Sequence, residues 1–186
     1  MLLGLEVNQN MSKPLPKFRY HPEPLATGAI VVSEEKCECC GSVAGYKYVA
    51  SFYAVDEVLS LCPWCIASGE AAEKFEGSFS DDWPLNDAGL SQSIIREVTT
   101  RTPGFETWQQ EEWLTHCEDA CAFLGDATVR DIKELAEGRG RVEDGQEWKT
   151  EDFLELAKYY KPKGSPALYK FECLHCHEVL YGLDQC

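Results

Sequence analysis

Paired cysteines constrain the fold of this chain more than any other feature. Cys37 and Cys40 form one C-x-x-C pair, Cys62 and Cys65 form a second, and 21 residues separate the two pairs. Each pair can wrap a tight turn around a metal ion, and Gly41 gives the backbone the freedom that such a turn needs. The spacing predicts a structural zinc site with four cysteine ligands. A redox dithiol in the C-P-W-C sequence and an iron site are the alternatives.

A second set of cysteines lies in the other half of the chain. Cys117 and Cys121 are four residues apart, which places both sulfurs on one face of a helix expected over residues 108–124. Cys173 and Cys176 form a further C-x-x-C pair after 51 intervening residues. These four side chains predict a second closed zinc site, so we expect two structural zinc ions per chain.

Several ligand assignments stay open at this level. The two helical cysteines can instead be core residues, since free cysteine is among the most often buried residue types. His116 or His177 can replace one sulfur of the second site. Cys39 can replace Cys37 in the first, although the spacing favours Cys37. Cys186, at the chain end, is expected to be a free thiol that binds no metal.

The remaining pattern predicts an α+β fold. A zinc-ribbon-like module with a small sheet is expected over residues 15–92, after an extension over 1–14. An acidic helical module, closed by a second zinc-knuckle hairpin, is expected over 93–186 and can pack with the first as one domain. The expected elements are an arm and strand over 12–36, a strand over 45–53, a short helix from Pro63, a connector over 77–92, helices over 108–124, 128–137 and 150–160, a loop over 138–145, and strands over 167–172 and 178–182.

Aromatic residues are expected to serve packing. In the N-terminal arm, Phe18 and Tyr20 flank Arg19 and precede His21, which predicts an arm anchored on the domain by its two rings. Trp108 and Trp113 are expected in the core of the second module.

The charge of the chain narrows the classes of partner. The formal net charge is -15, and residues 105–157 hold 15 acidic residues against five basic ones. Two thirds of the net negative charge therefore lies in the second half of the chain. Such a chain repels phosphate backbones, which excludes general nucleic-acid binding. Solvated helix faces explain acidity in most proteins, but an acidic surface can also attract a basic protein partner.

The sequence favours a cytoplasmic protein. Its most apolar stretches, at 29–32 and 62–67, are far shorter than the roughly 20 residues that cross a bilayer, so no membrane association is expected. The first residues have no basic region and too short an apolar run for a secretion signal. In a reducing cytoplasm, clustered cysteines bind metal more often than they form disulfides.

An enzyme is the less favoured interpretation. A hydrolytic zinc keeps an open position, whereas both predicted sites are closed and rich in sulfur. On a helix, His116, Glu118 and Asp119 point in different directions, and Cys117 cannot face its neighbour His116. We therefore expect no enzymatic activity.

A series of motifs runs in order along residues 15–182. They are L-P-K-F-R-Y-H-P at 15–22, T-G at 27–28, C-x-C-C-G at 37–41, F-Y at 52–53, L-C-P-W-C-I at 61–66, A-A-E-K-F at 71–75, T-P-G-F at 102–105, W-Q-Q-E at 108–111, Trp113, H-C at 116–117, C-A-F at 121–123 and F-x-C-L-H-C at 171–176. Together they resemble the CbrC family of bacterial proteins.

The resemblance implies a function in toxin tolerance. The family's name-giving member is associated with tolerance to a DNase-type colicin, and relatives look like immunity proteins encoded beside secreted toxins. Nuclease toxins are basic because they bind phosphate, so an acidic, metal-stapled protein would suit such a partner. The expected function is tolerance or immunity by protein binding. A metal-dependent or thiol enzyme and a zinc-stabilised adaptor with another partner are the alternatives, and the oligomeric state stays open.

Overall fold

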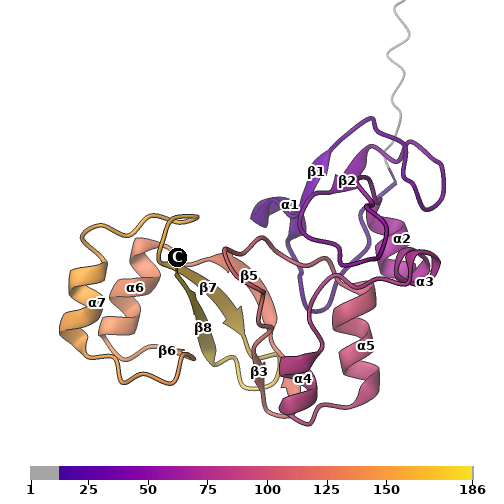
Figure 1. Cartoon of the computed structure of the whole chain (residues 1–186). Coiled ribbons are helices and arrows are strands. Elements are labelled where there is room, and N and C mark those ends of the chain that lie inside the picture. Colours follow the sequence, from indigo (N-terminus) through magenta and orange to yellow (C-terminus); the bar gives the residue numbers. More distant parts are fainter. Residues whose placement is uncertain (1–12, 186) are drawn as a thin grey trace, which may run out of the picture.

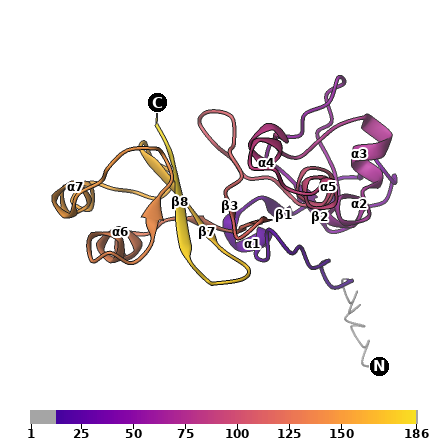
Figure 2. The same ribbon diagram turned by 90° about the horizontal axis from the view of Figure 1, so that it is seen from below.

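The computed structural model describes residues 13–185 and has a mixed α and β architecture, as expected. The molecule is elongated (Figure 1 and Figure 2), with helices α2 (Pro63–Ser68) and α3 (Glu70–Phe75) at one end. Helices α6 (Val129–Ala136) and α7 (Thr150–Leu156) lie at the other end. The two cysteine-rich halves of the sequence thus form two regions of one elongated molecule.

A small sheet forms the N-terminal region. Helix α1 (Pro24–Thr27) is followed by β1 (Ile30–Val32), which pairs antiparallel with β2 (Tyr46–Tyr48). The predicted short helix begins at Pro63. Proline is favoured there because the N–H groups of the first helical turn have no acceptor within the helix, so the missing N–H of proline costs no hydrogen bond. It ends at Gly69, whose φ of 83° suits glycine, and α3 follows at once.

Two further helices connect the regions. The expected connector contains α4 (Trp83–Asp87), and α5 (Gln92–Arg101) follows it. Ser91 caps α5 by accepting a hydrogen bond from the Ile94 N–H. At 10 residues, α5 is the longest helix in the described part of the chain, where no helix is long and apolar enough to cross a membrane.

A four-stranded sheet forms the C-terminal region. Its strands lie in the order β5-β7-β8-β6, and β7 and β8 form the predicted hairpin. The helices expected over 128–137 and 150–160 are confirmed as α6 and α7, which pack against each other. The bounds of the strands are β5 (Ala122–Asp126), β6 (Arg141–Val142), β7 (Ala167–Glu172) and β8 (Val179–Asp184).

The helix expected over 108–124 is wrong. The segment contains the short strands β3 (Thr115–His116) and β4 (Asp119–Ala120) and then enters β5. Pairing of β5 with β7 satisfies its backbone, so a long-range contact overrides the helical spacing of the apolar residues Trp113, Leu114, Cys117, Cys121 and Leu124. The second half is therefore a mixture of helix and sheet rather than mainly helical.

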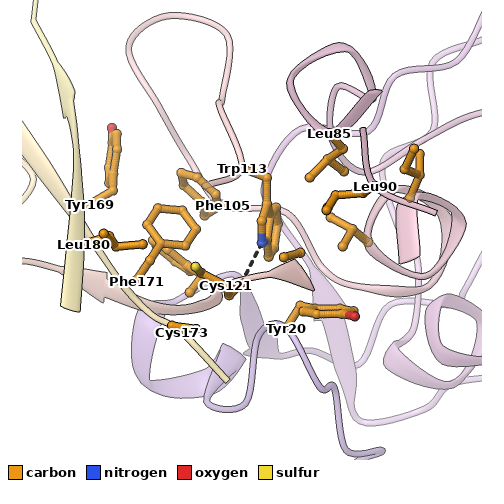
Figure 3. Close-up of a cluster of buried hydrophobic side chains, with 14 of the residues drawn as sticks. Tyr20, Leu85, Leu90, Phe105, Trp113, Cys121, Tyr169, Phe171, Cys173 and Leu180 are labelled. Atoms are coloured by element: carbon orange, nitrogen blue, oxygen red, sulfur yellow. Dashed lines mark hydrogen bonds between the residues drawn. The ribbon is translucent and has the colours of Figure 1, made fainter. Parts of the chain in front are cut away.

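One hydrophobic cluster is formed by residues from both regions (Figure 3). Trp113 lies between Leu85 and Phe171, and its indole N–H donates to the Cys121 carbonyl oxygen at 2.9 Å. The core position expected for Trp113 is confirmed, whereas Trp108 is 55% exposed and does not belong to the core. The cluster takes residues from either side of position 92, where a module boundary was expected.

The N-terminal arm packs as predicted. Phe18 is 4% exposed and Tyr20 is 1% exposed, so both rings anchor the arm. His21 is fully buried beside them, with its ring edge-on to Phe123 at 5.0 Å between centroids. The part of the expected extension before residue 13 lies outside the described residues.

Candidate metal centres

Four cysteine sulfurs of the N-terminal region meet at one point. The Sγ atoms of Cys37, Cys40, Cys62 and Cys65 all lie within 4.8 Å of one another, and we call these residues the first tetrad. The Cys37 and Cys65 sulfurs are 3.9 Å apart, and the Cys40 and Cys62 sulfurs are 4.0 Å apart. A tetrahedral ion with metal–sulfur bonds of about 2.3 Å needs sulfurs about 3.8 Å apart. The first tetrad could therefore hold one metal ion.

The local backbone aims these sulfurs at one another. The Cys62 N–H donates to the Cys37 sulfur at 3.2 Å, and the Gly41 N–H donates to the Cys37 carbonyl oxygen at 2.7 Å. Gly41 has a φ of 73°, which a side chain would disfavour. Cys62 occupies the N-cap position of α2 and Cys65 lies in its first turn, so the helix fixes the spacing of the second pair.

Two charged side chains tie the loops of the first tetrad together. Lys74 donates from its Nζ to the carbonyl oxygens of Glu38 and Cys39 at 2.8 Å and 2.6 Å. The Glu38 carboxylate accepts the N–H groups of Leu59 and Ser60 at 2.8 Å and 2.9 Å. The two cysteine pairs are thus held in register by bonds that do not involve their sulfurs.

Burial and hydrogen bonding shift the pKa values of three cysteines of the first tetrad in different directions. It raises the pKa of Cys62 to about 11 and also raises the pKa of Cys65. Burial opposes ionisation of Cys40 as well, but hydrogen bonds from Ser42 and neighbouring thiols outweigh it and lower that pKa to about 7. In the absence of a cation, the C-P-W-C pair therefore ionises less readily than a free thiol.

A second group of ligand atoms lies where two hairpins meet. Its members are His116, Cys117, Cys173 and Cys176, whose ligand atoms lie within 4.8 Å of one another, and we call them the second tetrad. The Cys117 and Cys176 sulfurs are 3.8 Å apart, and His116 Nδ1 lies 3.3 Å from each of them. These separations are close to those of a tetrahedral ion with bonds of about 2.3 Å to sulfur and about 2.0 Å to nitrogen. The second tetrad could therefore hold another metal ion.

Tight turns present both halves of the second tetrad. Cys117 and Glu118 join β3 to β4 with φ values of 51° and 59°, the pattern of a two-residue primed hairpin turn. Residues with side chains adopt this conformation at a cost on the order of 1 kcal/mol each. On the other side, the His175 N–H donates to the Cys173 sulfur at 3.4 Å and the His177 N–H to the Cys173 carbonyl oxygen at 3.1 Å.

The structure does not bring Cys121 into the second tetrad. Its side chain is fully buried in the cluster around Trp113, and burial raises its pKa to about 12. Residues 115–126 form strands and a turn, so a spacing of four no longer places Cys117 and Cys121 on one face. His116 takes the fourth position, one of the two substitutes that the sequence left open.

Other candidates fall outside the tetrads. Cys39 lies beside Cys65 but is not among the four mutually close sulfurs. His177 pairs its Nδ1 with the Glu172 carboxylate at 2.8 Å. Cys186 lies outside the described residues.

Comparison with known proteins places the chain in a family. Residues 15–185 match the family described as "Uncharacterised protein family (UPF0167)". The chain belongs to the UPF0167 family. It is 52% identical over 177 residues to UPF0167 protein PA1536 of Pseudomonas aeruginosa, which covers 94% of this chain and 99% of the relative.

The UPF0167 relatives include mycobacterial proteins. UPF0167 protein Mb2317 of Mycobacterium bovis and UPF0167 protein MT2352 of Mycobacterium tuberculosis are each 39% identical to this chain over 167 residues. The match covers 87% of this chain and 89% of each of these relatives. No solved structure matches the chain.

In this UPF0167 chain, Asp119 connects the second tetrad to the N-terminal arm. Its Oδ1 accepts the Tyr20 hydroxyl at 2.8 Å, and its Oδ2 accepts the Arg19 guanidinium at 2.6 Å and faces His175 Nε2 at 2.9 Å. Burial opposes ionisation of Asp119, but these hydrogen bonds outweigh it and lower its pKa. The carboxylate therefore stays ionised and joins the arm, the β3–β4 turn and the β7–β8 knuckle.

Proposed function

We propose that this chain is a zinc-stabilised acidic protein that confers tolerance or immunity to a basic bacterial nuclease toxin, such as a DNase-type colicin, by binding it. We take UPF0167 and CbrC to be one family, because the motifs that resemble CbrC span 15–182 and the UPF0167 match spans 15–185. The observation that carries the proposal is an acidic surface that also exposes apolar side chains, described below.

Zinc is the metal that we propose for both tetrads, with two ions per chain. Zinc binds thiolate and imidazole ligands in tetrahedral geometry, and a set of four protein ligands is typical of structural sites. The nine cysteines in the described part of the chain are all free, which suits the reducing cytoplasm that we propose as its compartment. When bound, the metal would supply folding free energy and hold segments far apart in the sequence.

The acidic surface lies at the end of the molecule that contains α7 (Figure 1). Glu147, Glu151 and Glu155 are exposed there, and residues 105–157 as a whole have a net charge of -10. Leu154 and Tyr159 expose 50% and 59% of their surface. A hollow of about 490 Å³ lies in this surface, lined in part by Glu147, Glu155 and Tyr159.

A basic protein is the partner that this surface suits best. Opposite charge accelerates association and selects against wrong partners, while aromatic and aliphatic side chains provide area to bury. The phosphate-binding face of a nuclease is basic, and an acidic protein that covers it would compete with nucleic acid. The proposed mechanism is therefore stoichiometric occlusion without enzymatic turnover.

Titration of a DNase-type colicin nuclease domain with the purified protein tests this function. Plasmid cleavage should stop at one protein per nuclease. The triple variant Glu147→Gln, Glu151→Gln, Glu155→Gln should bind at least about tenfold more weakly, mainly through slower association, because it loses the charges that steer the encounter. The matched control Glu34→Gln, Asp56→Asn, Glu57→Gln removes the same charge from exposed positions of the N-terminal region and should bind normally.

Other outcomes would assign the chain to the alternative classes. Protection at far below one protein per nuclease would indicate an enzyme, because a stoichiometric inhibitor cannot act on more than one nuclease. Absence of any inhibition by the wild-type protein would contradict the immunity proposal and leave an adaptor with another partner. Equal weakening by the two triple variants would show that net charge, rather than the α7 surface, is responsible.

A further inference from the structure

A cavity of about 320 Å³ lies between the two regions and includes no residue of either tetrad. Its walls come from separate parts of the chain, namely residues 27–29, Ser51, residues 105–108, strands β5 and β7, and the loop before β7. The volume is at the lower end of the range for small-molecule sites, about 300–1,000 Å³. It suits a compact ligand rather than a peptide or a large cofactor.

Aromatic rings form the apolar part of the cavity. Phe105 and Phe123 stack with ring centroids 4.0 Å apart, and the Tyr169 ring lies 5.2 Å from Phe105. Figure 3 shows Phe105 and Tyr169 within the aromatic cluster. Trp108 adds an exposed wall, held in place because its indole N–H donates to the Gly164 carbonyl oxygen at 3.1 Å. Trp108, which is 55% exposed, offers its ring to an aromatic ligand, whereas Phe105, Phe123 and Tyr169 line the cavity as buried rings.

The wall that carries Thr27 is rigid. Burial lowers the pKa of His21 to about 4, so its ring is neutral. Its Nδ1–H donates to the Pro103 carbonyl oxygen at 2.8 Å, which leaves Nε2, 2.7 Å from Thr27 Oγ1, to accept the threonine hydroxyl. Gly125, with a φ of 105°, lies at an irregularity of β5, and a Cβ there would come within 3.4 Å of the Thr27 methyl group. These contacts hold Thr27 in place at the cavity wall.

Opposite charges line this cavity without pairing. Lys163 has a φ of 62° and donates its backbone N–H to Asp126 Oδ1 at 3.1 Å. Its Nζ lies 3.5 Å from the position of a Cβ on Gly28, so the absence of a side chain there leaves room for the ammonium group. Within residues 13–185, neither the Lys163 ammonium nor the Glu106 carboxylate forms an ion pair. One cation and two carboxylates beside aromatic rings are complementary to a ligand that carries both charges.

We propose that this cavity binds a small aromatic zwitterion of the amino-acid type. The ligand's carboxylate pairs with Lys163, its ammonium group is attracted to Glu106 and Asp126, and its ring packs against Trp108. This site is independent of the two tetrads and of the acidic α7 surface.

Calorimetric titration of the wild-type protein with three probes tests the proposal. L-Phenylalanine carries both charges, 2-phenylethylamine lacks the carboxylate, and 3-phenylpropanoate lacks the ammonium group. L-Phenylalanine should bind at least about tenfold more tightly than either, because each charge-assisted contact contributes roughly that factor. Binding should also change the tryptophan fluorescence, and Trp108→Phe should remove most of that change.

Charge-removing variants identify the residues responsible. Lys163→Gln should weaken the binding of L-phenylalanine and 3-phenylpropanoate by about tenfold or more and leave the binding of 2-phenylethylamine unchanged. Lys161→Gln removes an exposed lysine of the same loop that does not line the cavity, and it should bind all three probes normally. The proposal fails if L-phenylalanine shows no saturable binding at millimolar concentration, if Lys163→Gln binds it as the wild type does, or if 2-phenylethylamine binds equally well.

Discussion

The two tetrads have similar ligand geometry but different surroundings. In the first, Cys37, Cys62 and Cys65 are only 2–3% exposed and belong to the hydrophobic cluster of the N-terminal region. In the second, Cys117 and Cys176 are exposed and only Cys173 is buried. The folding of a small core that includes metal ligands depends on the bound ion. A metal site at the surface instead adds stability to a core that forms without it. We therefore expect the first tetrad to determine folding and the second to hold two hairpins together.

Loss of the first tetrad should have the largest effect. Cys65→Ser should lower the metal content from two ions to one per chain, measured by elemental analysis. It should also lower the melting temperature by more than about 10 °C, because a structural zinc site contributes folding free energy on the order of 10 kcal/mol.

Cys39→Ser is the matched control for that variant. It removes a sulfur that lies beside Cys65 but outside the first tetrad, so both ions and the melting temperature should be retained. If Cys39→Ser loses the ion and Cys37→Ser does not, Cys39 is the ligand and the assignment of Cys37 is wrong.

Loss of the second tetrad should have an intermediate effect. Cys173→Ser should remove one ion and cost roughly 2–4 kcal/mol of unfolding free energy, similar to a cross-link that closes a long loop. Cys121→Ala should retain both ions and lose only the packing of one buried side chain. Chemical denaturation with parallel metal analysis distinguishes the Cys173→Ser and Cys121→Ala variants. Loss of an ion from Cys121→Ala would show that Cys121 is a metal ligand, as the sequence predicted.

The last prediction concerns His21, which lies in the arm outside both tetrads and affects stability through pH rather than through metal content. The pKa of His21 falls from its ordinary 6.5 to about 4 because the ring is buried, so between these values the unfolded chain binds a proton that the folded protein does not. The stability linked to this ring is complete above pH 6.5 and is lost as the pH falls toward 4, by about 3 kcal/mol.

The variant His21→Gln isolates this contribution from the acid sensitivity of the metal sites. The difference in unfolding free energy between wild type and His21→Gln should shrink as the pH falls from 7 toward about 4. Parallel curves over that range would show that His21 does not titrate as its burial implies.

Local patterns predicted much of the fold. The hairpin around Cys173 and Cys176, the two helices α6 and α7, and the proline-initiated α2 all follow from residues close together in the sequence. The segment 108–124 failed because its apolar spacing matched a helix, while its partner strand β7 begins more than 40 residues later at Ala167. Periodicity measures local preference, and it does not contain the free energy of a distant strand pairing.

The sequence by itself determined the cysteine pairs, the concentration of acidic residues and the arm that packs by its aromatic rings, because each depends on neighbours along the chain. Only the tertiary structure decided that His116 rather than Cys121 completes the second tetrad. It alone also formed the cavity between Thr27, Glu106, Asp126 and Lys163. These two features join segments that are far apart in the sequence, and their contacts arise from strand pairing and core packing that no local pattern encodes.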